Sequence, residues 1–166
     1  MLRKKVCVLG SVAGGKTSLV RRFVERAFSD RYNTTVGVRI DKKVTRCLGQ
    51  EINLALWDFA GEDEFAWAQT SYLRDSHGFL LVVDGTRRTT FDAAARMRER
   101  LLAQVGPLPT VVVLNKQDVQ DQWEVDAAAI AALTADGCHV VLSSAKLGQG
   151  VEEAFTKVTE LALARL

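Results

Sequence analysis

The chain has 166 residues, of which 48% are apolar and 25% are charged, and its 22 Lys and Arg residues against 20 Asp and Glu residues give a formal charge of +2. These values predict one globular domain over residues 1–166 and exclude a disordered chain, a collagen and a disulfide scaffold. A charge so close to zero argues against nucleic acid as a partner, and the longest apolar run, Ala127 to Leu133, is too short to cross a membrane.

Short apolar runs and helical apolar stripes alternate along the chain. Runs rich in Val and Leu that end abruptly in polar residues or glycine are typical of buried strands in a parallel sheet. In chain order we expect a strand at Val6–Leu9, a helix within 19–27, a hairpin of Val38–Leu48 and Ile52–Leu56 joined by Gly49-Gln50, a strand at Phe79–Val83, a helix within 91–105, a strand at Val111–Leu114, a helix within 125–133, a strand at Val140–Leu142 and a helix within 151–162. The pattern predicts an α/β fold: a mostly parallel six-stranded sheet with one antiparallel edge strand, flanked by about five helices.

A phosphate-binding loop is predicted between the first strand and the first helix. The segment Gly10–Thr17 fits G-x-x-x-x-G-K-[ST], a loop whose backbone N–H groups point inward at a phosphate beside the positive end of a helix. Lys16 is expected to reach the outer phosphates, and Thr17 to offer its hydroxyl to Mg²⁺. The expected nucleotide contacts of this region are Gly10, Ser11, Ala13, Gly14, Gly15, Lys16, Thr17 and Ser18. A glycine-rich structural turn is the alternative, and the motif alone does not identify the base.

Two further loops follow the strands Val111–Leu114 and Val140–Leu142. The first reads Asn115-Lys116-Gln117-Asp118, and the second Ser143-Ser144-Ala145-Lys146. A carboxylate such as that of Asp118 can accept hydrogen bonds from both N1–H and the exocyclic amine of guanine, a donor pair that adenine lacks. The aliphatic stem of Lys116 is expected to cover the ring. Because ligands of open parallel sheets bind at the carboxyl ends of the strands, all three loops are expected at one site.

Five motifs in order resemble those of the small GTPases of the Ras superfamily. The family order G-x-x-x-x-G-K-T, T-x-G, D-x-x-G, N-K-x-D and S-A-K is matched by Gly10–Thr17, Thr35–Gly37, Asp58–Gly61, Asn115–Asp118 and Ser144–Lys146. The resemblance covers essentially the whole chain and implies the small G domain fold of the P-loop NTPases. Asp84–Phe91 and Ser71–Arg74 look most like the Rab branch, whereas Trp57–Gly61 also resembles the Roc domains of Roco proteins.

The resemblance implies a GTP/GDP switch with Mg²⁺ and a role for each matched position. Thr35 and Gly61 would contact the γ-phosphate and relax when it leaves, and Asp58 would hold Mg²⁺ through a water. Ala145 would donate its N–H to the guanine carbonyl, and Phe28 would pack on the ring, with a core aromatic as the alternative. The implied site residues are Thr17, Thr35 and Asp58 for Mg²⁺; Phe28, Asn115, Lys116, Asp118, Ser144, Ala145 and Lys146 for the nucleoside; and Lys16, Thr35, Gly61 and Glu62 for catalysis.

Two positions depart from the family pattern, and both concern hydrolysis. Glu62 stands where the family usually carries a Gln that orients the attacking water, and it places negative charge beside the γ-phosphate. Val12 stands at a loop position that is Gly in Ras, where a β-branched side chain could crowd an arginine from a partner. We therefore expect slow intrinsic hydrolysis, with Asp63 or Glu64 as alternative residues to position the water.

The expected partners are protein effectors, an exchange factor and a GTPase-activating protein, with effectors binding through Arg31–Val38 and Gly61–Arg74. Three cysteines, Cys7, Cys47 and Cys138, cannot all pair and have no metal-ligand spacing, so we expect a reducing compartment and a cytoplasmic location. Neither end carries a lipidation motif, from which we expect no direct membrane anchor in this chain. A bacterial-type soluble GTPase, or a protein trimmed of its tail or of a larger parent, would have such ends.

Three other functions stay open at this point. The first is a GTP-locked scaffold that has lost hydrolysis, which Glu62 and Val12 favour. The second is the G domain of a larger Roco-type protein. The third is a P-loop phosphotransferase acting on a small metabolite, which would need an arginine-bearing lid for which the sequence shows no insertion.

Overall fold

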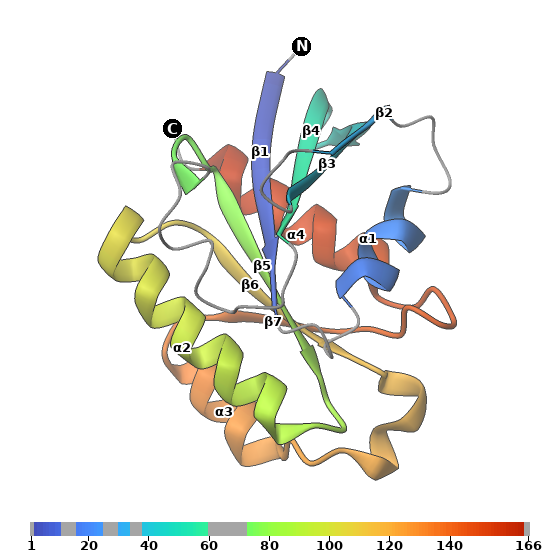
Figure 1. Ribbon diagram of the computed structural model, residues 1–166, viewed down its shortest axis with the longest axis vertical. Helices are drawn as coiled ribbons and strands as arrows, with labels where there is room; N and C mark the ends of the chain where they lie inside the picture. The colour runs from blue at the N-terminus through green and yellow to red at the C-terminus, as the bar shows by residue number, and fades with distance from the viewer. Residues whose placement is uncertain (1, 11–15, 25–29, 34–37, 60–72, 165–166) are drawn as a thin grey trace.

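The structure is a computed structural model that describes residues 2–10, 16–24, 30–33, 38–59 and 73–164, the side chains of Thr17 and of 30–33 excepted (Figure 1). Strands and helices alternate through most of the chain. The described elements are β1 (Leu2–Leu9), α1 (Lys16–Val24), β2 (Asp30–Asn33), β3 (Val38–Cys47), β4 (Gln50–Phe59), β5 (Gly78–Asp84), α2 (Arg88–Val105), β6 (Thr110–Asn115), a 3-10 helix (Gln117–Gln122), α3 (Ala127–Ala135), β7 (His139–Leu142) and α4 (Val151–Ala164).

The strands form one sheet in the order β2-β3-β4-β1-β5-β6-β7. The pairs β4-β1, β1-β5, β5-β6 and β6-β7 are parallel, whereas β2-β3 and β3-β4 are antiparallel. The predicted α/β fold with a mostly parallel sheet is confirmed. The described part of the sheet has seven strands, one more than the six expected, because β2 pairs with residues Arg39–Lys42 of β3.

The hairpin turn lies one residue earlier than predicted. Cys47 pairs with Gln50, so the two turn residues are Leu48 and Gly49 rather than Gly49 and Gln50. Both have a left-handed backbone, with φ of 50° and 76°, as two-residue hairpin turns that match the twist of their strands require. Leucine rarely adopts this conformation, which is why the sequence pointed to the glycine as the first turn residue.

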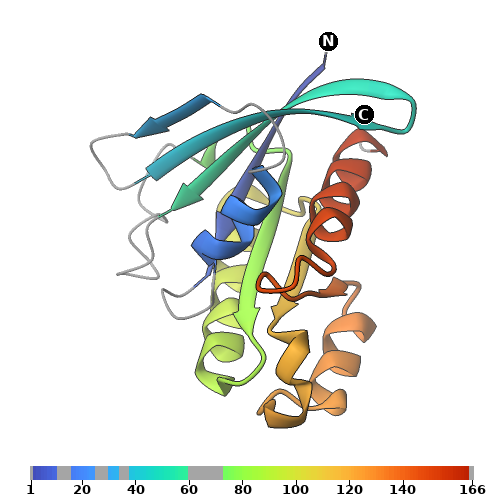
Figure 2. The ribbon, with the colours of Figure 1, turned by 90° about the vertical axis from the view of Figure 1, so that its right-hand side faces the viewer.

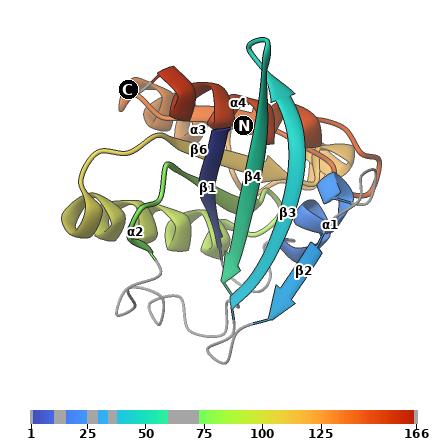
Figure 3. The same cartoon turned by 90° about the horizontal axis from the view of Figure 1, so that it is seen from above.

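Helices cover both faces of the sheet, and each face has its own apolar core. One core joins α2 and α3 to residues such as Cys7, Phe79 and Leu81, and the other joins α1 and α4 to residues such as Val6 and Leu80. Figure 3 shows α2 and α1 on opposite sides of β1, β4 and β3. The tip of the β3–β4 hairpin reaches the end of α4, where Cys47, Ile52 and Leu163 form a small separate cluster (Figure 2). Each described helix falls short of the length and apolar character that crossing a membrane requires.

Candidate nucleotide site

The site is built at the carboxyl ends of β1, β5, β6 and β7, where parallel strands leave their loops at one edge of the sheet. Gly10 follows β1 and lies so close to β5 that a Cβ there would meet the Val82 carbonyl oxygen at 2.6 Å. Only glycine fits this approach, and it brings the start of the predicted phosphate loop against the neighbouring strand. Residues 11–15, and with them the predicted contacts Ser11, Ala13, Gly14 and Gly15, lie outside the described residues.

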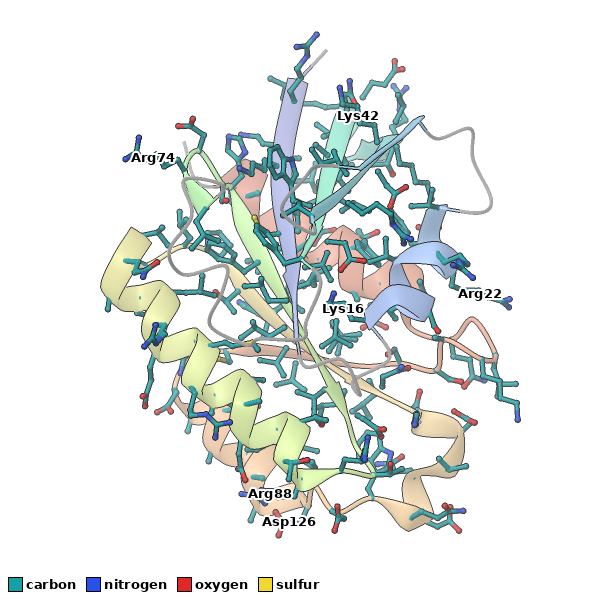
Figure 4. All side chains as sticks on the ribbon, in the orientation of Figure 1. Lys16, Arg22, Lys42, Arg74, Arg88 and Asp126 are labelled. Atoms are coloured by element: carbon teal, nitrogen blue, oxygen red, sulfur yellow. The ribbon has the colours of Figure 1, made fainter. Side chains whose placement is uncertain are left out.

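Lys16 is the first residue of α1 and is almost fully buried (labelled in Figure 4). Its ammonium donates hydrogen bonds to the Asp58 carboxylate and to the Phe59 carbonyl, both at the end of β4. The structure therefore brings together two predicted site residues that are 42 positions apart. A buried ammonium at the start of a helix, next to a buried carboxylate, can serve an anionic ligand and a cation side by side.

Sequence analysis missed two charged residues that extend this contact. Arg39 of β3 is the cross-strand neighbour of Asp58, and its Nη2 lies 3.8 Å from Asp58 Oδ2. On its other side, Arg39 Nε lies 3.5 Å from Asp41 Oδ2, and Asp41 is fully buried. The five motifs contain neither residue. The one available signal was the unbroken polar series Arg39, Asp41, Lys43 on alternate positions of a strand.

A second part of the site is a pocket of about 390 Å³, which is large enough for a nucleobase. It is lined by Ser18, Asn115, Lys116, Asp118, Ala145 and Lys146, all of which the sequence predicted as nucleotide contacts. These residues come from α1 and from the two loops after β6 and β7. The structure thus assembles the base-binding motifs of the sequence around one cavity.

Hydrogen bonds between the two loops hold this pocket in shape. Asn115 Oδ1 accepts from the Ala145 backbone N–H at 3.0 Å, and Asp118 Oδ1 accepts from the Ser144 hydroxyl at 2.8 Å. Gln117 N–H donates to the Ser143 carbonyl at 2.8 Å. Since the Ala145 N–H already has a partner in the protein, its predicted bond to a guanine carbonyl stays a prediction.

Lys116 occupies a left-handed backbone conformation, with φ 72° and ψ 39°. Its ammonium lies 2.7 Å from Asp84 Oδ2, a fully buried carboxylate at the end of β5. Burial alone would raise the pKa of Asp84, but hydrogen bonds from Lys116 and from the Thr86 side chain and backbone outweigh it and hold that pKa below its usual value. Lys116 also lines the pocket, and the cover that its aliphatic stem would form over the ring stays a prediction.

Asp58 is the one predicted Mg²⁺ ligand whose side chain the structure describes, and a buried carboxylate fits such an ion. In the part of the chain that the structure describes, no three His, Cys, Asp or Glu side chains gather into a metal-binding cluster. Mg²⁺ usually keeps several waters and takes one or two carboxylates together with phosphate oxygens, a donor set to which Asp58 could contribute its buried carboxylate. The other two predicted ligands, the Thr17 side chain and Thr35, lie outside the described residues, as do Phe28, Gly61, Glu62 and the alternatives Asp63 and Glu64.

The three cysteines are free and buried, as expected from the absence of a pairing pattern. Burial raises the pKa of Cys7 to about 11, so this thiol stays protonated at neutral pH. Its Sγ lies 3.2 Å from the Ser76 hydroxyl, which satisfies it inside the core. Cys7 is therefore a packing residue of β1 rather than a nucleophile.

Comparison with known proteins identifies relatives along nearly the whole chain. The sequence profile of the Ras family matches residues 5–164. Ras-related protein Rab-4 of Dictyostelium discoideum is 31% identical over 166 residues, which cover 98% of this chain and 80% of that protein. Ras-related protein Rab-4B of Homo sapiens is 33% identical over 164 residues, covering 98% and 77%. Ras-related protein Rab-32C of Dictyostelium discoideum is 35% identical over 117 residues, covering 69% of this chain and 52% of that protein.

Proposed function

The chain belongs to the Ras family of small GTPases and is Rab-like, and from this premise we propose that it is a Mg²⁺-dependent switch with slow hydrolysis of its own. Ras-family proteins bind GTP and GDP with Mg²⁺, so the chain is a GTP-binding small GTPase switch. The proposal adds the rate, the residues and the binding surfaces. It rests above all on the pocket between Asn115–Asp118 and Ser144–Lys146, which opens at the same sheet edge as Lys16.

In this proposal each residue of the site has its own role. Asp118, with one carboxylate oxygen held by Ser144, selects guanine, because guanine offers two adjacent donors to a carboxylate. Lys16 binds the outer phosphates from the start of α1, and Asp58 holds the metal side of the site. Mg²⁺, when bound, neutralises charge on the phosphate oxygens. Thr35 and Gly61 sense the γ-phosphate in this proposal, and its loss releases both segments.

Slow hydrolysis follows from two sequence positions. Glu62 replaces the water-orienting Gln of the family pattern and adds negative charge near the γ-phosphate, which disfavours the attacking water. Val12, which stands at a loop position that is Gly in Ras, is proposed to oppose the entry of an arginine from a partner. In this proposal the protein stays in its GTP form until a GTPase-activating protein acts on it, and an exchange factor reloads it.

Effector binding is proposed for residues 31–38 and 61–74. Support comes from the described end of the second segment, where the Lys5 ammonium donates to the Arg74 carbonyl at 3.0 Å and lies 3.8 Å from the centre of the Trp57 ring. These contacts tie that segment to β1 and β4, so a change in the segment reaches the strands beside it. We also propose a cytoplasmic location, which three free cysteines favour.

The test is single-turnover hydrolysis of GTP loaded onto the purified protein with Mg²⁺, alone and as Glu62→Gln. Slow hydrolysis that accelerates in the Gln variant supports the proposal. Hydrolysis that is fast in the unchanged protein contradicts it and assigns the water to Glu62, Asp63 or Glu64. No hydrolysis by either protein, with GTP still bound, favours a GTP-locked scaffold instead and makes Val12→Gly the next variant.

A further inference from the structure

Four charged side chains of alternating sign form a row through the site: Lys16 of α1, Asp58 of β4, then Arg39 and Asp41 of β3. Lys16, Asp58 and Asp41 are buried, and the Arg39 side chain is 21% exposed. Arg39 is therefore a cation between two carboxylates, 3.8 Å from Asp58 Oδ2 and 3.5 Å from Asp41 Oδ2. The row is electrically balanced by itself, before any ligand is considered.

Asp41 fixes Arg39 in this place. A fully buried carboxylate needs positive partners, because the removal of its charge from water is strongly unfavourable. Arg39 and Asp41 also lie two residues apart on one strand, so their side chains extend from the same face of β3. The guanidinium is thus held by the strand and by Asp41 whatever Asp58 binds on its other side.

We propose that Arg39 is a positioning residue that weakens the affinity of the site for Mg²⁺, and so sets how much Mg²⁺ the protein needs to retain its nucleotide. This inference rests on the proposed function, in which Asp58 faces the metal. The Arg39 guanidinium adds to the Lys16 ammonium in neutralising the Asp58 charge, and it repels a divalent cation that this carboxylate would hold. Partners that support metal ligands commonly raise metal affinity by about 10–100-fold, and a cationic partner acts in the opposite sense because it repels the metal.

Mg²⁺ takes few ligands from a protein, so other residues do not compensate for a weakened Asp58 ligand. Because Mg²⁺ binds through one or two carboxylates and dehydrates reluctantly, the charge left on Asp58 has a large share in its affinity. Arg39 also begins the chain's return from the segment that carries the predicted ligand Thr35, with β3 starting at Val38. β3 follows the segment that carries Thr35, and β4 precedes the segment that carries Gly61. The contact from Arg39 to Asp58 therefore joins the two strands next to these segments.

The experiment measures the release of fluorescently labelled GDP at a series of free Mg²⁺ concentrations, and takes the concentration at which release slows halfway. Both variants are made in the otherwise unchanged protein, so that Asp41 stays beside residue 39. Arg39→Gln removes the positive charge and keeps an N–H donor for Asp41, whereas Arg39→Lys keeps the charge. Circular dichroism and GDP binding at saturating Mg²⁺ confirm that each variant is folded.

The inference predicts that Arg39→Gln lowers the half-point by about tenfold, with Arg39→Lys within about threefold of the unchanged protein. A merely structural role would act in the opposite sense, because a damaged site loses Mg²⁺ more readily. An unchanged or raised half-point in the Gln variant overturns the inference, as does a Lys variant that behaves like Gln. If the unchanged protein retains no GDP at any Mg²⁺ concentration, the proposed function itself fails.

Discussion

The indole N–H of Trp123 donates a hydrogen bond to the backbone carbonyl of Lys116, 2.9 Å away. The same ring packs so tightly on Gly85 that a Cβ there would lie 2.2 Å from the indole Cε2. Trp123 thus joins the loop after β5 to the loop after β6, and it supports Lys116 in its left-handed conformation. Neither Trp123 nor Gly85 belongs to a nucleotide-binding motif of the sequence.

Trp123→Phe should separate these two contacts, because it keeps an aromatic ring on Gly85 and removes the N–H donor. The Lys116 carbonyl retains the Val119 N–H at 3.1 Å, so we expect the free energy of unfolding to fall by about 1 kcal/mol, with weaker GDP binding. Trp123→Ala should lose about 2–3 kcal/mol, since it also empties the space above Gly85. Urea unfolding and GDP titration measure both effects. A Phe variant equal to the unchanged protein in both assays would show that this hydrogen bond contributes neither to stability nor to GDP binding.

Gly10→Ala should destabilise the protein by about 2 kcal/mol more than Gly106→Ala. Both glycines have positive φ, 154° and 78°, but only the Cβ at Gly10 meets a neighbouring backbone atom, the Val82 oxygen, whereas Gly106 has open space around it. The Gly106 variant is the control for a positive φ, which at the ψ of −170° found there costs about 1–3 kcal/mol by itself. Denaturant unfolding of the two variants gives the difference, and equal losses would show that β1 and β5 can separate without cost.

Asp118→Asn should exchange the base preference of the pocket. The amide offers one acceptor and one donor where the carboxylate offers two acceptors, so the guanine amine loses its partner and GTP affinity should fall about 100-fold or more. Xanthosine triphosphate carries a carbonyl at that position and should bind better than GTP. Competition of the two nucleotides for the loaded site measures the preference. Asp121→Asn, the same charge change in the exposed part of the 3-10 helix, should leave it unaltered, and a variant that still prefers GTP would argue against Asp118 as the guanine reader.

His77 should make the protein less stable as the pH falls below about 6.5. Burial lowers the pKa of His77 and the nearby Lys4 charge adds to this, while Nδ1 accepts the Lys5 backbone N–H at 2.8 Å. The unfolded chain therefore binds this proton more readily than the folded one. Its contribution to stability is complete above the unfolded pKa of about 6.5 and is lost as the pH falls from there toward the lower folded pKa.

Urea midpoints at pH 7.5 and pH 5.5 test this expectation. In His77→Asn the difference between the two midpoints should shrink, because the titrating group is gone and an amide oxygen can take its place as acceptor. His139→Asn removes an exposed histidine and is the matched control. A difference that persists in the His77 variant would assign the pH dependence to other groups.

The order of strands and helices along the chain and the residues that line the pocket were predictable because both depend on local signals. Runs such as Phe79–Val83 have few alternatives to a buried strand, and the loops after them are short enough to fix where Asn115 and Ser144 lie. β2 was not predicted because its residues, Asp30–Asn33, have no apolar alternation in the sequence, although their backbone pairs with β3.

The burial of charged residues on β3 was not predicted for a different reason. Asp41 and Lys43 face the buried side of the strand, whereas Val44 on the other side is 49% exposed. Burial of these charges is possible because Arg39 lies beside Asp41, and because the Lys43 ammonium donates to the Phe23 carbonyl at 2.9 Å and lies 3.4 Å from Glu152. Such partners come from distant elements, and hydrophobic periodicity carries no information about them.

The short β2 leaves the outer half of β3 as an open edge. In the described residues β2 pairs with β3 only as far as Lys42, so the backbone of Lys43–Cys47 faces outward beside the exposed Val44 and Leu48. Open edges invite pairing with another copy of the chain, and charged side chains on them oppose it. Lys42 and Arg46, both exposed, would bring like charges together in such a pair. β3 thus contributes Arg39 and Asp41 to the nucleotide site, and the exposed charges of Lys42 and Arg46 on the same strand oppose aggregation of the protein at high concentration.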